Sequence, residues 1–310
     1  MELVNFSESE EIFNIYRGSE KKKTLIHNEI RYLVKFPDPL REKNKDISYI
    51  NNAYSEYIGS KIFEMLGFET QKVVLGKYKV EDKEKIVCAC EDFTNESNAL
   101  LEFENLAISA VEKKTDTEIV DIMQVIKMNE NFINVEETIK MFWKIFIVDS
   151  LIGNTDRHNG NWGFLGNLKD KDYKFAPIYD NGSCLNPLLE DRDIEQYLNN
   201  ETELKNIALN TYSCLKENNK KINYYHYINS LKNEECNKAL NEIFPKIELE
   251  KINEMIDNIE CISEIRKQFY KQIIKIKYDN ILKNAYKKLN NTKWIKMQNR
   301  TGTECIKNAK

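Results

Sequence analysis

Alternation of apolar and polar residues in the first ninety positions predicts short strands arranged around one helix. The clearest strand spans residues 29–36, and a helix follows from residue 51 or 52 to about residue 66. Residues 73–79 and 85–90 then form a hairpin that turns across residues 81–84. The order strand, strand, helix, strand, strand indicates a small antiparallel sheet with one helix.

Helical periodicity dominates after residue 95, most clearly over residues 135–151. Large apolar residues recur there at helical spacing: Ile139, Phe142, Trp143, Phe146, Ile147 and Leu151. Residues 162–165 and 173–177 form a second hairpin, with its turn expected at Gly166 and Asn167. From about residue 191 onward we expect helices with polar connections.

These elements predict an α+β fold in two parts, with the boundary after residue 93. Residues 1–93 form the small sheet with its helix, and residues 94–310 form a mainly helical part. A chain of 310 residues is long enough for two such parts, each with a core.

Composition and charge limit the partners and the cellular compartment that we expect for the chain. The net charge of −4 gives the chain no overall bias toward nucleic acid or membrane, and its longest apolar run is far short of a membrane span. The seven cysteines are scattered, which favours buried free thiols over a metal site or disulfides. The acidic N-terminus has no apolar signal core, so we expect a cytoplasmic protein.

The chemistry gathers between residues 152 and 180. Asp156 and Asn161 stand five residues apart in a loop after the buried helix, and Asp180 follows the second hairpin. Two carboxylates and an amide on neighbouring loops are suited to holding the metal of a metal nucleotide, because Mg²⁺ prefers hard oxygen ligands. The sequence therefore predicts phosphoryl transfer that uses ATP and Mg²⁺.

The spacing Asp-x-x-x-x-Asn matches the catalytic loop of protein kinases, in which the aspartate is the base and the asparagine a metal ligand. Asp180 begins Asp-Asn-Gly, which corresponds to the kinase Asp-Phe-Gly metal ligand with its middle residue changed. The pair of motifs in this order is more specific than either alone. The structural alternative is an Asx-rich turn without chemistry.

Residues 1–93 supply the charged side chains expected to accompany these motifs in a nucleotide site. Lys35 lies in a strand between Val34 and Phe36, where a lysine is costly without an anionic partner. Glu56 on the following helix is the candidate partner, as in the lysine–glutamate ion pair that positions ATP in kinases. The alternatives are a lysine that reaches solvent and a partner role for Glu64 on the same helix.

The predicted nucleotide site is weakest at its phosphate loop. Gly18 and Ser19 are the candidate phosphate contacts, although one glycine permits only one unusual backbone turn. Residues 21–23 are lysines, which can add charge or form a solvated edge. Glu91 and Phe93 lie where a hinge would bind adenine through backbone groups.

Arg157 and His158 are expected to support the loop that carries Asp156. Arg157 should pair with a nearby acid. His158 is favoured as a hydrogen-bonding brace over a base, and its position beside both metal-binding loops makes it a candidate cofactor contact. Trp162 is expected to pack in the core behind Asn161.

The stretches GNTDRHNGNWGFL, APIYDNGS, RYLVKFP and NNAYSEYIGSKIFEMLGF together resemble the HipA-like serine/threonine kinases, in particular short members without the N-terminal extension of HipA. The resemblance covers roughly residues 15–190. It implies a two-lobed protein-kinase-like fold with Asp156 as base, Asn161 and Asp180 as Mg²⁺ ligands and Lys35 on the ATP phosphates. It also implies autophosphorylation, for which Ser19 is the only serine in the loop.

The resemblance further implies a protein substrate carrying serine or threonine, a possible small DNA-binding antitoxin as partner, and a bacterial cytoplasmic location with export left open. Direct DNA binding is not expected. Residues 266–310 contain 13 Lys/Arg and two Asp/Glu around an amphipathic helix. This tail is either a packed helix with a solvated basic face or a docking surface for an acidic partner.

Other functions are compatible with part of these features. A small-molecule or lipid kinase of the same broad fold uses similar groups, and a pseudokinase would bind nucleotide without turnover. A metal-dependent hydrolase built on Asp156, His158 and Asp180 lacks further histidine ligands, because only His27 and His226 remain elsewhere in the chain.

Overall fold

The structure is a computed structural model that describes residues 3–13, 22–37, 51–95, 97–111, 117–129, 133–167 and 172–291. Gly18 and Ser19, the predicted phosphate contacts, lie outside these residues, as does the end of the basic tail.

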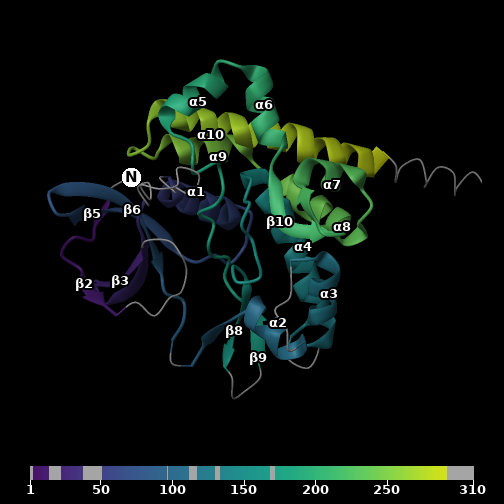
Figure 1. The fold of residues 1–310 in the computed structure, drawn as a ribbon, viewed down its shortest axis with the longest axis horizontal. Helices are drawn as coiled ribbons and strands as arrows, with labels where there is room; N and C mark the ends of the chain where they lie inside the picture. Colours follow the sequence, from purple (N-terminus) through teal and green to yellow (C-terminus); the bar gives the residue numbers. More distant parts are fainter. Residues whose placement is uncertain are drawn as a thin grey trace, which may run out of the picture.

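A six-stranded sheet forms one side of the molecule (Figure 1). Its order is β1-β5-β6-β4-β3-β2, and every neighbouring pair is antiparallel except β1 with β5, which is parallel. The strands are β1 (Val4–Asn5), β2 (Glu10–Ile12), β3 (Lys22–His27), β4 (Ile30–Lys35), β5 (Val73–Val80) and β6 (Lys83–Glu91). The first two strands fall where the sequence shows little pattern, because each is too short to display alternation.

At two tight turns the strands end at residues other than those predicted. Asn28 and Glu29 both have positive φ and join β3 to β4, so Glu29 belongs to a two-residue turn and not to the strand. In the next hairpin Val80 pairs with Lys83, so the turn consists of Glu81 and Asp82 alone. The predicted four-residue turn was therefore too long.

The two faces of this sheet have different neighbours. One face buries Val34 and Phe36 in a small cluster of its own. Lys35 points to the opposite face, where its register partner Cys88 belongs to the main core together with α1 (Asn52–Met65). Because side chains alternate along a strand, a lysine between two buried apolar residues must face α1.

The remaining part is mainly helical and contains a three-stranded sheet of order β7-β8-β9 (Figure 1). These strands are β7 (Ala99–Glu102), β8 (Gly163–Asn167) and β9 (Asp172–Phe175). Gly166 and Asn167 are strand residues paired with Tyr173 and Asp172, so the turn predicted at these two positions was wrong. The boundary after residue 93 stays a prediction.

Helix α4 (Val135–Ile152) leads into the candidate site. The Asn134 side chain caps its start by accepting a hydrogen bond from the Glu137 amide, and Gly153 ends it in the left-handed conformation. Trp162 stacks on Phe103, with ring centroids 4.1 Å apart, which is the core packing expected for it.

The other helices lie on either side of the candidate site in the sequence, with α2 and α3 before α4 and the rest, with one hairpin, after it. The helices are α2 (Phe103–Val111), α3 (Ile119–Met128), α5 (Asp191–Leu198), α6 (Glu201–Leu209), α7 (Tyr224–Ser230), α8 (Glu234–Ile243), α9 (Leu249–Asp257) and α10 (Glu264–Lys277), and a short 3₁₀ turn, η2 (Phe244–Lys246), follows α8. The hairpin of β10 (Tyr212–Glu217) and β11 (Lys220–Asn223) interrupts the purely helical arrangement predicted there.

The predicted amphipathic tail helix is present through residue 291. A π-helical segment, η3 (Tyr278–Lys283), continues α10 and passes into a helix over residues 284–291. The apolar side of α10 and η3 is buried and includes Phe269, Ile273 and Ile281. Within the described ranges no helix combines the length and apolarity that crossing a membrane requires.

Candidate active site

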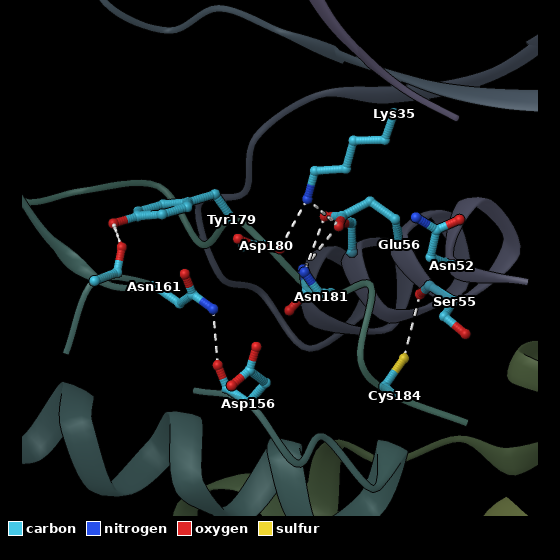
Figure 2. Close-up of polar contacts among 12 residues, drawn as sticks. Lys35, Asn52, Ser55, Glu56, Asp156, Asn161, Tyr179, Asp180, Asn181 and Cys184 are labelled. Atoms are coloured by element: carbon cyan, nitrogen blue, oxygen red, sulfur yellow. Dashed lines mark hydrogen bonds and ion pairs between the residues drawn. The ribbon is translucent and has the colours of Figure 1, made fainter. Parts of the chain in front are cut away.

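The ammonium group of Lys35 lies between two carboxylates at the junction of the two parts (Figure 2). Its Nζ is 2.6 Å from Glu56 Oε2 and 2.8 Å from Asp180 Oδ1. Lys35 and Glu56 are almost completely buried. A buried charge requires a charged or hydrogen-bonded partner, so the three groups depend on one another. The structure thus brings the predicted pair of Lys35 and Glu56 together with Asp180, the predicted metal ligand.

Glu56 also fixes the backbone after Asp180. Its Oε1 accepts a hydrogen bond of 2.9 Å from the Asn181 amide, and the Asn181 side chain donates to Ser60 on the same helix. Asp180 has a φ of 57°, a left-handed conformation that aspartate tolerates better than most residues. Helix α1 therefore holds the Asp-Asn-Gly loop directly.

The loop from Asp156 to Asn161 closes on itself. The carbonyl of Asp156 accepts hydrogen bonds from the His158 amide at 2.8 Å and from Asn161 Nδ2 at 2.7 Å. The side-chain nitrogen of Asn161 is thus used within the loop, which leaves its oxygen as the atom suited to a metal ion. Figure 2 shows Asn161 beside Asp156 in this arrangement.

His158 braces the same loop, because its Nδ1 accepts a hydrogen bond of 3.0 Å from the Gly160 amide. This contact fits the predicted brace. The predicted contact between His158 and a cofactor stays a prediction.

Arg157 connects the loop to the rest of the site. Its guanidinium donates to both carboxylate oxygens of Asp149 on α4, each at 3.1 Å. It also donates to the carbonyls of Asn161 and Tyr179 and to the side chain of Asn181. Asp149 is the acid expected for Arg157. One buried guanidinium, a planar group with five donors, therefore ties both proposed metal-binding loops to α4.

The two aspartates differ in their electrostatics. Burial raises the pKa of Asp156, His158 counteracts part of this effect, and the charge of Asp180 adds to it. Burial acts in the same direction on Asp180, but the charge and hydrogen bond of Lys35 outweigh it and hold the pKa of Asp180 below its ordinary value. A raised pKa suits a proton acceptor and a lowered pKa suits a metal ligand.

The donor set fits Mg²⁺. Asp180 and Asn161, with Asp156 nearby, offer carboxylate and amide oxygens, which are hard ligands. No three histidine, cysteine, aspartate or glutamate side chains within the described part of the chain are grouped to hold a metal ion. An Mg²⁺ ion would thus be held by this mixed set together with nucleotide phosphates.

Glu91 is placed differently from the expectation. Its amide donates to the Lys72 carbonyl, and its own carbonyl accepts from the Gln71 side chain at 3.0 Å. The Glu91 amide is thus used within the sheet, whereas its carbonyl oxygen can accept a second hydrogen bond. The ring of Phe93 lies 5.9 Å from that of Tyr179, and the adenine contacts predicted for Glu91 and Phe93 stay predictions.

Lys22 joins the site although the sequence analysis left it within a run of three lysines. It stands directly opposite Lys35 in the β3–β4 pair, and its charge helps to lower the pKa of Asp180. Lys23 points to the other face and pairs with Glu11. The alternation of β3 was the signal that distinguishes the two lysines.

Comparisons with known proteins agree with this geometry. Residues 17–262 match the HipA-like C-terminal domain family. The chain is 41% identical over 253 residues to the serine/threonine-protein kinase CtkA of Helicobacter pylori, covering 80% of this chain and 76% of CtkA.

Solved structures give the same result. The crystal structure of the proinflammatory kinase CtkA of Helicobacter pylori matches with a TM-score of 0.82 and 35% identity, covering 94% of this chain and all of the other. HipA of Shewanella oneidensis, in a complex with HipB and operator DNA, matches with a TM-score of 0.52 and 12% identity, covering 92% of this chain and 75% of that one, and so shares the fold.

The predicted α+β, two-lobed kinase-like fold is therefore confirmed, with a mixed sheet in the smaller lobe. The family predicted from the sequence motifs is confirmed as well. The chain belongs to the HipA-like C-terminal domain family and is a serine/threonine kinase of the HipA-like type.

Proposed function

We propose that this kinase transfers the γ-phosphoryl group of ATP, with Mg²⁺, to serine or threonine hydroxyls of a protein substrate and of itself. The observation that supports the proposal most is the placement of Lys35 between Glu56 and Asp180. An intact strand-lysine to helix-glutamate pair beside the metal-binding aspartate is the arrangement that active kinases require.

Each residue has a separate role in this proposal. Asp156 accepts the proton of the attacking hydroxyl and orients it, which its raised pKa favours. Asn161 and Asp180 hold Mg²⁺, which neutralises phosphate charge when it is bound. Lys35 contacts the nucleotide phosphates and is itself held by Glu56. Gly18, Ser19, Phe93 and His158 are the further proposed nucleotide contacts.

Incubation of the purified protein with radiolabelled ATP and Mg²⁺ tests the proposal. The wild type should label itself, and Asp156→Ala and Asp180→Ala should each abolish labelling while the protein stays folded. Lys61→Ala is the matched control, because Lys61 lies on α1 but forms its ion pair with Glu64 at the surface. Labelling that persists in both aspartate variants would refute the assignment.

Mass-spectrometric mapping of the labelled protein tests autophosphorylation at a defined residue. We expect a serine or threonine to carry the label, with Ser19 as the first candidate. Binding of ATP without any turnover would identify a pseudokinase instead.

A HipB-like antitoxin partner and a cytoplasmic location stay predictions. The HipA structure contains HipB, but 12% identity supports a shared fold and nothing about partners of this chain. Co-expression with neighbouring small open reading frames, followed by affinity purification, tests for such a partner.

A further inference from the structure

An open pocket of about 660 Å³ lies between Asp156, α6 and the β10–β11 hairpin, and Lys35 is not among its lining residues. Its lining includes Asp156, Glu203, Asn206, Asn210, Tyr212 and Lys221. The volume lies in the range of ligand-binding clefts, which is roughly 300–1,000 Å³. The pocket shares Asp156 with the proposed catalytic site but none of the proposed nucleotide contacts.

We propose that this pocket binds the acceptor polypeptide as an extended segment, with an acidic residue of the segment meeting Lys221 and a basic residue meeting Glu203. The inference rests on the proposed kinase function, because it assigns the substrate side of the same site. It adds that the kinase prefers substrates with an acidic residue at one position and a basic residue at another, which the kinase assignment alone does not predict.

One wall of the pocket is suited to an extended backbone. Glu203, Asn206 and Asn210 follow one another at intervals of three and four residues along α6 and its C-terminal cap. Residues at this spacing share one face of a helix. The two carboxamides can each donate and accept hydrogen bonds, as the amide groups of an extended chain require.

The two walls differ in charge. Glu203 is exposed on the helical wall. On the other wall Lys221 stands directly opposite Lys216 in the β10–β11 pair, so two ammonium groups share that face of the hairpin. The charge of Lys221 extends to Asp156, where it lowers the pKa of the carboxyl group. Within the described part of the chain Lys221 forms no ion pair, so its charge is available to an acidic residue of the substrate.

Hydrogen bonds beside the pocket fix two of its lining segments, at Asp156 and at Thr211. The Tyr224 hydroxyl donates a hydrogen bond of 2.7 Å to the Asn154 carbonyl, and the Asn154 side chain accepts from the Asp156 amide. Buried Lys277 donates to Thr211 Oγ1, a group of the pocket lining, and to the Ala208 carbonyl. A lining held in this way presents a bound segment to Asp156 in a constant position, which is a large part of catalysis by orientation.

A positional-scanning library of serine peptides, phosphorylated with radiolabelled ATP and Mg²⁺, tests the proposal. The wild type should select an acidic residue at one position and a basic residue at another. Lys221→Ala should reduce the acidic selection at least fivefold, and Glu203→Gln should reduce the basic selection by a similar factor. The KM for ATP should stay within twofold of wild type in both.

Matched controls lie beside each residue. Lys220→Ala changes the preceding residue of β11, whose side chain points to the other face and whose register partner is Glu217. Glu201→Gln changes an exposed glutamate at the start of the same helix outside the pocket lining. Both controls should keep the wild-type selectivity. Because all four side chains are exposed, the variants should fold, and thermal denaturation verifies this.

The outcomes separate the two proposals. A wild type that labels neither itself nor any peptide overturns the proposed function and the pocket assignment with it. A wild type that labels peptides with a selectivity that survives Lys221→Ala and Glu203→Gln overturns the pocket assignment alone.

Discussion

Lys22 stands directly opposite Lys35 on the antiparallel strands β3 and β4, and both side chains therefore lie on the face of the sheet that meets Asp180. Two like charges opposite each other in a sheet destabilise it unless anions lie nearby. Asp180 and Glu56 supply part of that negative charge. ATP phosphates are the ligand that this arrangement would attract.

Lys22→Ala should raise the KM for ATP about tenfold with little change in kcat, because Lys22 is expected to bind phosphate and not to take part in proton transfer. Steady-state kinetics with varied ATP measures this. Lys23→Ala is the matched control, since Lys23 points to the other face and pairs with Glu11. Equal effects of the two substitutions would contradict the assignment.

Asp156→Asn should lower the kinase activity and raise the stability of the fold at pH 7. Loss of the proposed base should reduce phosphoryl transfer by about 10²–10⁴-fold. Burial raises the pKa of Asp156, so its ionised form costs folding free energy, and this cost appears as the pH rises above the ordinary pKa of 3.8. The variant should thus be more stable than wild type at pH 7, with the difference disappearing in acid.

Urea denaturation at several pH values and kinase assays measure the two effects of Asp156→Asn. Glu64→Gln, on the exposed side of α1, should change neither property. A fully active or less stable Asp156→Asn protein would contradict the prediction.

Asp149→Asn should destabilise the protein by about 3–5 kcal/mol, the usual effect of removing one partner of a buried ion pair. Arg157 would keep its charge in the core and lose one of its two charge-assisted bonds. Guanidinium denaturation measures the loss. The exposed pair of Arg192 and Glu190 provides the comparison, because Arg192→Ala should cost only about 0–1 kcal/mol.

Lys277 should make stability depend on pH above neutrality. Burial lowers its pKa to about 7 from 10.5; its hydrogen-bond acceptors are the Ala208 carbonyl and Thr211, and the nearby thiol of Cys184 slightly opposes the shift. Between these two pKa values the unfolded chain binds more protons than the fold. Stability therefore rises by up to about 1.4 kcal/mol per pH unit as the pH increases over that interval, and this gain is lost as the pH falls back to 7.

Lys277→Met removes this titration, so the stability of the wild type relative to the variant should increase from pH 7 to pH 10. Lys275→Met, at an exposed position on the same helix, should follow the wild type throughout. Parallel pH profiles of wild type and Lys277→Met would rule out the depressed pKa.

The sequence alone was sufficient for the elements whose pattern is local. Helix α4 was predicted within one residue because large apolar side chains recur through it and Gly153 follows it. The spacing of Asp156, Asn161 and Asp180 indicated kinase chemistry, since these residues lie in one short stretch of chain. The family followed from longer stretches in both lobes, which the family match confirms. Strand β7 was missed because it is stabilised by pairing with the distant strand β8. The β10–β11 hairpin is a local pairing, and it was missed because its short strands lie within a stretch where helices were expected.

Only the tertiary structure decided which charged side chains meet. Strand alternation separates Lys22 from Lys23, but only the packed sheet shows which of the two faces Asp180. No local pattern indicates that Asp149 is the partner of Arg157 or that Lys277 bonds to Thr211. Each of these placements depends on which face of a strand or helix is covered by an element far away in the chain. Burial on that face raises the free energy of a charged side chain, so the charge must be balanced by an ion pair or by hydrogen bonds.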